Sequence, residues 1–167
     1  RNIKKSLTLE EIAKIYNYET EPGSVNDMCR DYWIFIYLCN GLNMKDLCLL
    51  TYKNIQGDLI VFNRAKTIRS RRSNPEPIRI ALRDDSKRII TKWGQHQLTQ
   101  DTYIFPYLKP AMTPQKQRDN IGLLIHLINE HMKQIAVELE IYKPITTYYA
   151  RHSFATILKN SGVSTEF

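Results

Sequence analysis

Arg151 and its neighbours form the part of the sequence best suited to chemistry on a phosphate. Tyr148 lies three residues before Arg151, and His152 follows it directly, in a stretch that reads Thr-Thr-Tyr-Tyr-Ala-Arg-His-Ser-Phe-Ala-Thr over residues 146–156. In a helix, the i, i+3 spacing places Tyr148 and Arg151 on one face. A guanidinium offers a planar fork of donors that matches two phosphate oxygens, and a phenol or imidazole one turn away can reach the same group. The spacing indicates a phosphate site, although an amphipathic helix with a solvated arginine has the same spacing.

This segment resembles the second conserved box of the tyrosine recombinases, the phage integrase family. The box usually reads His-x-x-Arg-His, followed by a small residue, an aromatic residue, Ala and Thr, and then a glycine; Arg151, His152 and Gly162 match it. Tyr148 stands where the first His is expected, a departure that resembles integrases of Bacteroides-type mobile elements. The resemblance implies that Arg151 holds the scissile phosphate, that Tyr148 supports proton transfer, and that His152 contributes to DNA binding.

Residues 38–50 resemble the first box of the same family, in which Gly-x-Arg precedes an acidic residue and Leu. They read Leu-Cys-Asn-Gly-Leu-Asn-Met-Lys-Asp-Leu-Cys-Leu-Leu, so Gly41 matches and Asn43 stands where the arginine is expected. An amide donates fewer, uncharged hydrogen bonds, so a cation that would neutralise the transition state is missing from this catalytic position. The segment also suits a helix junction with a core-facing stripe. Lys53, in the Tyr-Lys-Asn-Ile that follows, is expected to bind DNA.

Lys66 resembles the family's hairpin lysine, which the resemblance implies is the acid that protonates the departing 5′ oxygen. Such an acid speeds the step because a bare alkoxide is a poor leaving group. Strand side chains alternate, so Arg64 and Lys66 are expected on one face of a strand, and Arg64 is the candidate for the missing cation. Taken alone, Lys66 would be an ordinary exposed strand lysine. Arg69, Arg71 and Arg72 form a basic hairpin tip expected to meet DNA phosphates, or else a plain solvated loop.

The elements that must position these residues follow from caps and periodicity. Thr8 and Glu11 have the spacing of a capping box, and Gly41 and Gly162 stand where helices would end in the left-handed conformation. The pattern predicts helices over residues 9–18, 25–40, 43–50, 85–98, 120–140 and 146–161, an antiparallel hairpin of strands 58–66 and 76–81, and a packed loop from 103 to 114. The fold class is therefore α+β: a mainly helical, integrase-type domain with a small antiparallel β-sheet, not a doubly wound parallel sheet.

The composition and net charge are compatible with a DNA-binding domain but do not by themselves indicate one. The 167 residues carry 24 Lys and Arg against 17 Asp and Glu, a formal net charge of +7, which suits a polyanionic partner but also serves solubility. Cys29, Cys39 and Cys48 have no metal-ligand spacing and are expected to be reduced core residues. His126 and His131 are off a common helical face, so we expect neither metal nor cofactor. No apolar run is long enough to span a bilayer, so we expect no membrane partner and a bacterial cytoplasmic, nucleoid-associated protein.

The resemblance covers nearly the whole sequence and implies one catalytic domain over residues 1–167. It implies metal-free DNA strand cleavage and rejoining through a 3′-phosphotyrosyl intermediate, with double-stranded DNA as partner and a tetramer on DNA in the full-length protein. It also implies that the N-terminal core-binding domain and the nucleophilic Tyr lie outside the sequence given. We therefore expect this fragment to be a monomer that binds DNA weakly and is inactive alone.

Two alternatives share the residues on which this interpretation depends. A type IB topoisomerase has the same chemistry but relaxes supercoils. A non-catalytic DNA-binding remnant of an integrase would explain Asn43. A metal-dependent nuclease would need clustered carboxylates, whereas Asp84 and Asp85 are better interpreted as a helix start.

Overall fold

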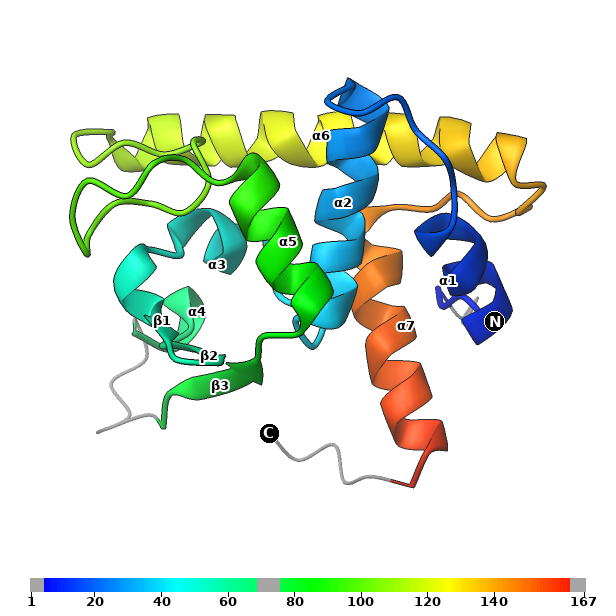
Figure 1. Ribbon diagram of the computed structural model, residues 1–167, viewed down its shortest axis with the longest axis horizontal. Coiled ribbons are helices and arrows are strands. Elements are labelled where there is room, and N and C mark those ends of the chain that lie inside the picture. Colours follow the sequence, from blue (N-terminus) through cyan, green and yellow to red (C-terminus); the bar gives the residue numbers. More distant parts are fainter. Residues whose placement is uncertain (1–4, 69–75, 163–167) are drawn as a thin grey trace. The chain divides into compact units, whose positions relative to one another are not determined.

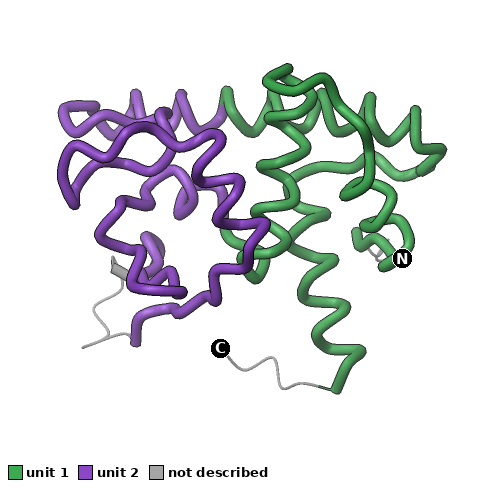
Figure 2. Tube along the Cα trace, in the orientation of Figure 1, with its two compact units in different colours: residues 1–42, 123–167 green, residues 43–122 purple. Residues whose placement is uncertain are grey.

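The computed structural model describes residues 5–68 and 76–162, as a mainly helical chain with one small sheet (Figure 1). In chain order the elements are α1 (Leu9–Tyr16), α2 (Val25–Leu38), α3 (Met44–Leu49), the 3-10 helix η1 (Tyr52–Asn54), β1 (Ile55–Gln56), β2 (Leu59–Phe62), α4 (Ala65–Ile68), β3 (Ile78–Ala81), α5 (Asp84–Trp93), α6 (Pro114–Glu138) and α7 (Thr147–Asn160). The predicted α+β class is confirmed. The chain divides into unit 1, residues 1–42 and 123–167, and unit 2, residues 43–122, which are described separately (Figure 2).

Unit 1 is built on α2, which packs against α1 and α7. The predicted capping box at the start of α1 is confirmed: Thr8 Oγ1 accepts from Glu11 N at 3.2 Å, and the Glu11 carboxylate accepts from Thr8 N at 2.9 Å. On α2, Trp33 and Phe35 are fully buried. The Trp33 indole also donates to the carbonyl of Thr146 at 2.9 Å, so α2 holds the residue directly before α7.

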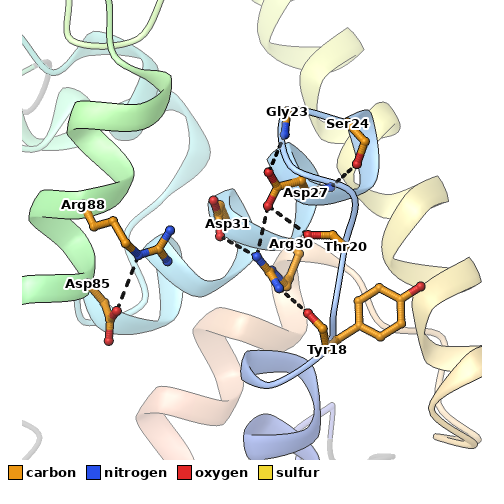
Figure 3. Close-up of polar contacts among 9 residues, drawn as sticks. All are labelled: Tyr18, Thr20, Gly23, Ser24, Asp27, Arg30, Asp31, Asp85 and Arg88. Carbon is orange, nitrogen blue, oxygen red and sulfur yellow. Dashed lines mark hydrogen bonds and ion pairs between the residues drawn. The ribbon is translucent and has the colours of Figure 1, made fainter.

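A buried charge network joins the start of α2 to the segment that precedes it (Figure 3). The Asp27 carboxylate accepts from Gly23 N at 2.8 Å and from Thr20 Oγ1 at 3.0 Å. Arg30 donates to Asp27 at 3.0 Å, to Asp31 at 3.3 Å and to the carbonyl of Tyr18. Both aspartates are almost completely buried. Removing one partner of such a network leaves an uncompensated buried charge, which destabilises a fold strongly.

Unit 2 contains a three-stranded antiparallel sheet in the order β1-β2-β3. The predicted hairpin is confirmed, with Ile60 opposite Ile80 and Phe62 opposite Ile78, and the isoleucine pair lies in the core. Strand β1 was not predicted, because two residues are too short for a period to show. Gly57 in the β1–β2 turn has a φ of 61°, which glycine adopts without strain.

The prediction that Arg64 and Lys66 lie in a strand is wrong. Strand β2 ends at Phe62, and the chain then turns into the short helix α4 (Ala65–Ile68). The reason is the carboxylate of Asp46, which accepts from Ala65 N at 3.0 Å and so satisfies a backbone donor at the start of α4. Strand alternation therefore gives no argument that Arg64 and Lys66 share a face.

The loop before α6 is packed, as predicted. Ile104 and Phe105 are fully buried, and the backbone of Ile104 donates to Leu50 O at 2.9 Å and accepts from Gln95 N at 2.8 Å. Helix α5 ends at Trp93, earlier than predicted. The next residue, Gly94, lies so close to the carbonyl of Ile90 that a Cβ on it would be only 2.4 Å from that oxygen, so the position requires a glycine. Helix α6 starts earlier than predicted, at Pro114, whose missing N–H and fixed φ suit a first helical position.

Cys29, Cys39 and Cys48 are reduced thiols and fully buried, as predicted. Burial raises the pKa of the Cys29 and Cys48 thiols to about 12, so both stay protonated and inert at neutral pH. Across residues 5–68 and 76–162, no helix is long and apolar enough to cross a membrane.

Candidate active site

Helix α7 carries Tyr148, Arg151 and His152, and its first turn is fixed from two sides. The carbonyl of Thr146 accepts from the Trp33 indole of α2 at 2.9 Å. The backbone N–H of Thr147 donates to the Asn129 side chain of α6 at 2.9 Å, which satisfies one of the donors that a helix start leaves open. Two neighbouring helices therefore set where α7 begins and which way its side chains face.

Arg151 is held by the backbone of Gly41. Gly41 has a φ of 72°, and its N–H donates to Ile36 O at 2.9 Å, which closes the end of α2. A Cβ on Gly41 would lie 3.1 Å from Arg151 Cα and 3.2 Å from both Cγ and the carbonyl oxygen of Arg151. Only a glycine permits both the conformation and the close approach. The glycine of the first box and the arginine of the second are thus in contact.

The Arg151 side chain is half-buried and has no partner within the described residues. No carboxylate in residues 5–68 and 76–162 pairs with the guanidinium, and no carbonyl there accepts a hydrogen bond from it. A partly desolvated guanidinium without a counter-ion favours binding of an anion, and its planar fork suits a phosphate. The environment of Arg151 therefore suits a side chain that binds an anion.

Tyr148 and His152 lie on the same side of α7, in ring contact. Their centroids are 4.2 Å apart with the planes tilted by 56°, and the Tyr148 side chain is exposed. The next tyrosine, Tyr149, is buried in the core. The structure therefore brings Tyr148 and His152 into contact, and Tyr148 and Arg151 lie one turn apart on α7, as their i, i+3 spacing predicted.

Sequence analysis missed Lys5, whose ammonium lies 5.7 Å from the centroid of the Tyr148 ring. The only sequence signal was a basic residue shortly before the capping box, and a single basic residue does not indicate a site.

Asn43, in unit 2, is the N-cap residue of α3. Its side-chain oxygen accepts from Lys45 N at 2.8 Å and caps the N-terminus of α3. An arginine has no acceptor and cannot form this cap, whereas asparagine is among the best residues for it. The replacement of the expected arginine therefore has a local physical reason.

The other predicted residues of unit 2 lie around α4 and η1. Lys66 is exposed on α4, and Arg64 is exposed just before it. Lys53 is exposed and pairs with Asp101 at 3.0 Å, an interaction that as a surface ion pair contributes at most about 1 kcal/mol and can give way to a phosphate. The predicted DNA-binding residues Arg69, Arg71 and Arg72 lie outside the described residues.

The predicted site residues are divided between the two units of the chain. Tyr148, Arg151 and His152 belong to unit 1, whereas Asn43, Lys53, Arg64 and Lys66 belong to unit 2. In the described part of the chain, no cluster of three or more His, Cys, Asp or Glu side chains could hold a metal ion. The chemistry that these residues offer is phosphate binding through cations, with Lys66 as an available proton donor.

Comparison with known proteins identifies the family. The model of the phage integrase family matches residues 5–167. The chain belongs to this family. Among solved structures, the crystal structure of XerA recombinase is similar over 97% of this chain, with a TM-score of 0.56 and 14% sequence identity. At that identity the similarity supports the integrase fold alone. This integrase-family chain spans 53% of the XerA chain, and no curated protein matches its sequence.

Proposed function

We propose that this chain is the part of a site-specific DNA recombinase that binds the scissile phosphate of double-stranded DNA. The observation that carries the proposal is Arg151, which is half-buried, has no counter-ion among the described residues and rests against the backbone of Gly41. A guanidinium fixed in this way is organised in advance for two oxygens of one phosphate. Membership of the phage integrase family supports DNA as the source of that phosphate.

The proposed reaction is a transesterification. A tyrosine hydroxyl attacks the DNA phosphate, loses its proton, forms a 3′-phosphotyrosyl bond and displaces the 5′ oxygen, which leaves as a hydroxyl after gaining a proton. The covalent link keeps the phosphodiester energy, so the 5′ hydroxyl of another strand can reverse the step. Arg151 neutralises the non-bridging oxygens, Tyr148 and His152 assist at the same phosphate, and Lys66 supplies the proton to the 5′ oxygen.

We propose Arg64 as the cation that compensates for Asn43. Its support is its exposed position directly before α4, the short helix that carries Lys66 and that Asp46 caps through Ala65 N at 3.0 Å. The tetramer on DNA and an origin in a Bacteroides-type mobile element belong to the same proposal, and their support is the resemblance of the two boxes.

A non-catalytic DNA-binding protein is the second candidate. It is favoured by Asn43, because this residue serves as a helix cap and leaves the position without a cation. Both candidates require Arg151 to bind DNA. They differ in whether a protein that also contains the nucleophilic tyrosine cleaves DNA, and in whether Arg64→Ala reduces that cleavage.

The test of the proposed function is DNA binding by this chain and its Arg151 variants. Arg151→Ala should weaken binding of a duplex by about tenfold or more, because a hydrogen bond to a charged group contributes about 1.5–3 kcal/mol. Arg151→Lys should be intermediate, since an ammonium keeps the charge but loses the fork. Arg118→Ala is the matched control, because it removes an exposed arginine from α6. Failure of the unmodified chain to bind duplex DNA, or equal losses in the Arg151 and Arg118 variants, would overturn the proposal.

A further inference from the structure

The segment before α1, residues 5–8, lies along α7. The backbone N–H of Leu7 donates to the buried hydroxyl of Ser153 at 2.8 Å, and the Leu7 side chain is 3% exposed. The Lys143 ammonium donates to the carbonyl of Ser6 at 3.3 Å. These contacts join positions at opposite ends of the sequence and hold both polar atoms of the Ser6–Leu7 peptide unit, directly after Lys5.

Lys5 is therefore held at a defined place on the surface. Its ammonium lies 5.7 Å from the centroid of the Tyr148 ring, within the range of a cation–π interaction. This interaction orients the ammonium but does not neutralise it, because the ring carries no net charge. The Lys5 side chain is exposed, so its donors remain open to a ligand from solvent.

Lys5 adds a second cation beside the Arg151 face of α7. Tyr148, which Lys5 contacts, shares that face with Arg151 and touches His152. Within residues 5–68 and 76–162, no carboxylate pairs with Lys5, Arg151 or His152. Cations that gather without acidic partners create a local positive potential, which attracts a polyanion.

We propose that Lys5 is a further DNA-binding residue that contacts a backbone phosphate beside the one held by Arg151. The inference rests on the proposed function and adds to it a contact from outside both boxes. An ammonium is a compact point charge and suits a single phosphate oxygen, whereas the guanidinium of Arg151 suits two. Lys5 thereby places one more cation beside Arg151 within unit 1, and its phosphate contact carries no base specificity.

The experiment measures how the affinity for a short duplex DNA of arbitrary sequence depends on salt, from about 50 to 200 mM. Lys5→Ala should lower the affinity and reduce the slope of log K against log salt by about 0.9, the change expected for one lost phosphate contact. Lys5→Arg should keep the slope. The matched control is Lys14→Ala, which removes an exposed lysine from the last turn of α1 in the same unit and should leave the slope unchanged.

The outcomes separate this inference from the proposed function. If the unmodified chain and Arg151→Ala behave as expected but Lys5→Ala retains the full slope, Lys5 is not a phosphate ligand and the proposed function stands. Equal losses for the Lys5 and Lys14 variants would also overturn the inference, because they would show a general effect of net charge. If the unmodified chain does not bind duplex DNA, both fail. Lys5→Ala should fold normally, because the Leu7 and Ser6 contacts remain.

Discussion

The contact between Gly41 and Arg151 shows how a residue without a side chain can position one that binds a ligand. Gly41 is in the left-handed region with a φ of 72°, and the space that its Cβ would occupy is filled by Arg151. The backbone of Arg151 and the first part of its side chain therefore lie against the backbone of Gly41. This reduces the freedom that Arg151 has to lose when it binds a phosphate.

Gly41→Ala should lower the free energy of unfolding by more than the cost of placing an alanine in the left-handed conformation. The left-handed conformation costs a residue with a Cβ about 1–2 kcal/mol, and the new Cβ would add a clash with Arg151 Cα at 3.1 Å. Gly23→Ala is the control, because Gly23 has a φ of 80° in the same unit and nothing within 4 Å of its missing Cβ. Urea unfolding should show the larger loss for Gly41→Ala, accompanied by weaker DNA binding. Equal losses would argue against a tight Gly41–Arg151 contact.

Asn43 illustrates a residue whose type is explained by the backbone it caps. We expect Asn43→Ala to lower the free energy of unfolding by about 1 kcal/mol, because α3 loses its side-chain acceptor. Asn43→Ser should retain most of the stability, since serine caps almost as well. Neither change should alter DNA affinity beyond the effect on folding. A loss of affinity in a fully folded Asn43→Ser variant would instead indicate that the amide itself binds the phosphate.

At the level of helices, the start of α1 is tied to the segment that leads into α7. The Glu11 carboxylate accepts from Thr8 N at 2.9 Å within the capping box and from the Lys143 ammonium at 2.8 Å. Lys143 also holds Ser6, so the same cluster supports the segment that carries Lys5. One carboxylate thus stabilises both a helix start and the candidate site beside it.

This cluster makes part of the stability depend on pH. Burial by itself would raise the pKa of Glu11, but hydrogen bonds from Lys143 and Thr8 and the ammonium's charge outweigh it and lower the pKa below its ordinary value of 4.5. A carboxyl with a lowered pKa in the folded state stabilises that state fully above its unfolded pKa. The contribution is lost as the pH falls through the folded pKa. Glu11→Gln should therefore flatten the dependence of unfolding free energy on pH below about 4.5.

The matched control for this prediction is Glu10→Gln. Glu10 is exposed in the same first turn of α1 and makes no contact with Lys143. Its variant should keep the pH dependence of the unmodified chain, measured by urea unfolding at several pH values. Identical pH profiles for Glu11→Gln and the unmodified chain would contradict the assignment.

For the whole molecule, three features support binding to DNA more directly than cleavage: the integrase fold, a net charge of +7, and an Arg151 that has no counter-ion among residues 5–68 and 76–162. We do not expect either tyrosine next to Arg151 to be the nucleophile. Tyr149 is only 5% exposed, and Tyr148 packs against His152 and lies under the Lys5 ammonium. By the resemblance of the second box, Tyr148 also occupies the position at which the family has a histidine.

We therefore expect this polypeptide to bind duplex DNA without forming a covalent link to it. The measurement is electrophoresis under denaturing conditions after incubation with labelled duplex, with a native gel of the same sample to show that complex had formed. A labelled protein band that survives denaturation would refute the prediction.

Much of the fold could be predicted from local sequence. The capping box of Thr8 and Glu11, the β2–β3 hairpin and the helical face shared by Tyr148 and Arg151 each depend on residues close together in the chain, where period and capping chemistry are visible. The two boxes indicated the family for the same reason. The short strand β1 could not be predicted because two residues show no period, and the end of α5 depends on the close approach of Gly94 to the Ile90 carbonyl. The start of α6 at Pro114 was a local signal that sequence analysis missed.

The remaining features depend on contacts between residues far apart in the sequence. The end of β2 at Phe62 follows from the Asp46 carboxylate on another element, so the expected strand through Lys66 did not form. The Gly41–Arg151 contact and the location of Lys5 depend on the packing of α7 against α2 and against residues 5–8, with Leu7 and Ser153 joined across 146 positions. Hydrophobic burial, which is not directional, brings such segments together, and only the packed structure shows which polar groups then meet.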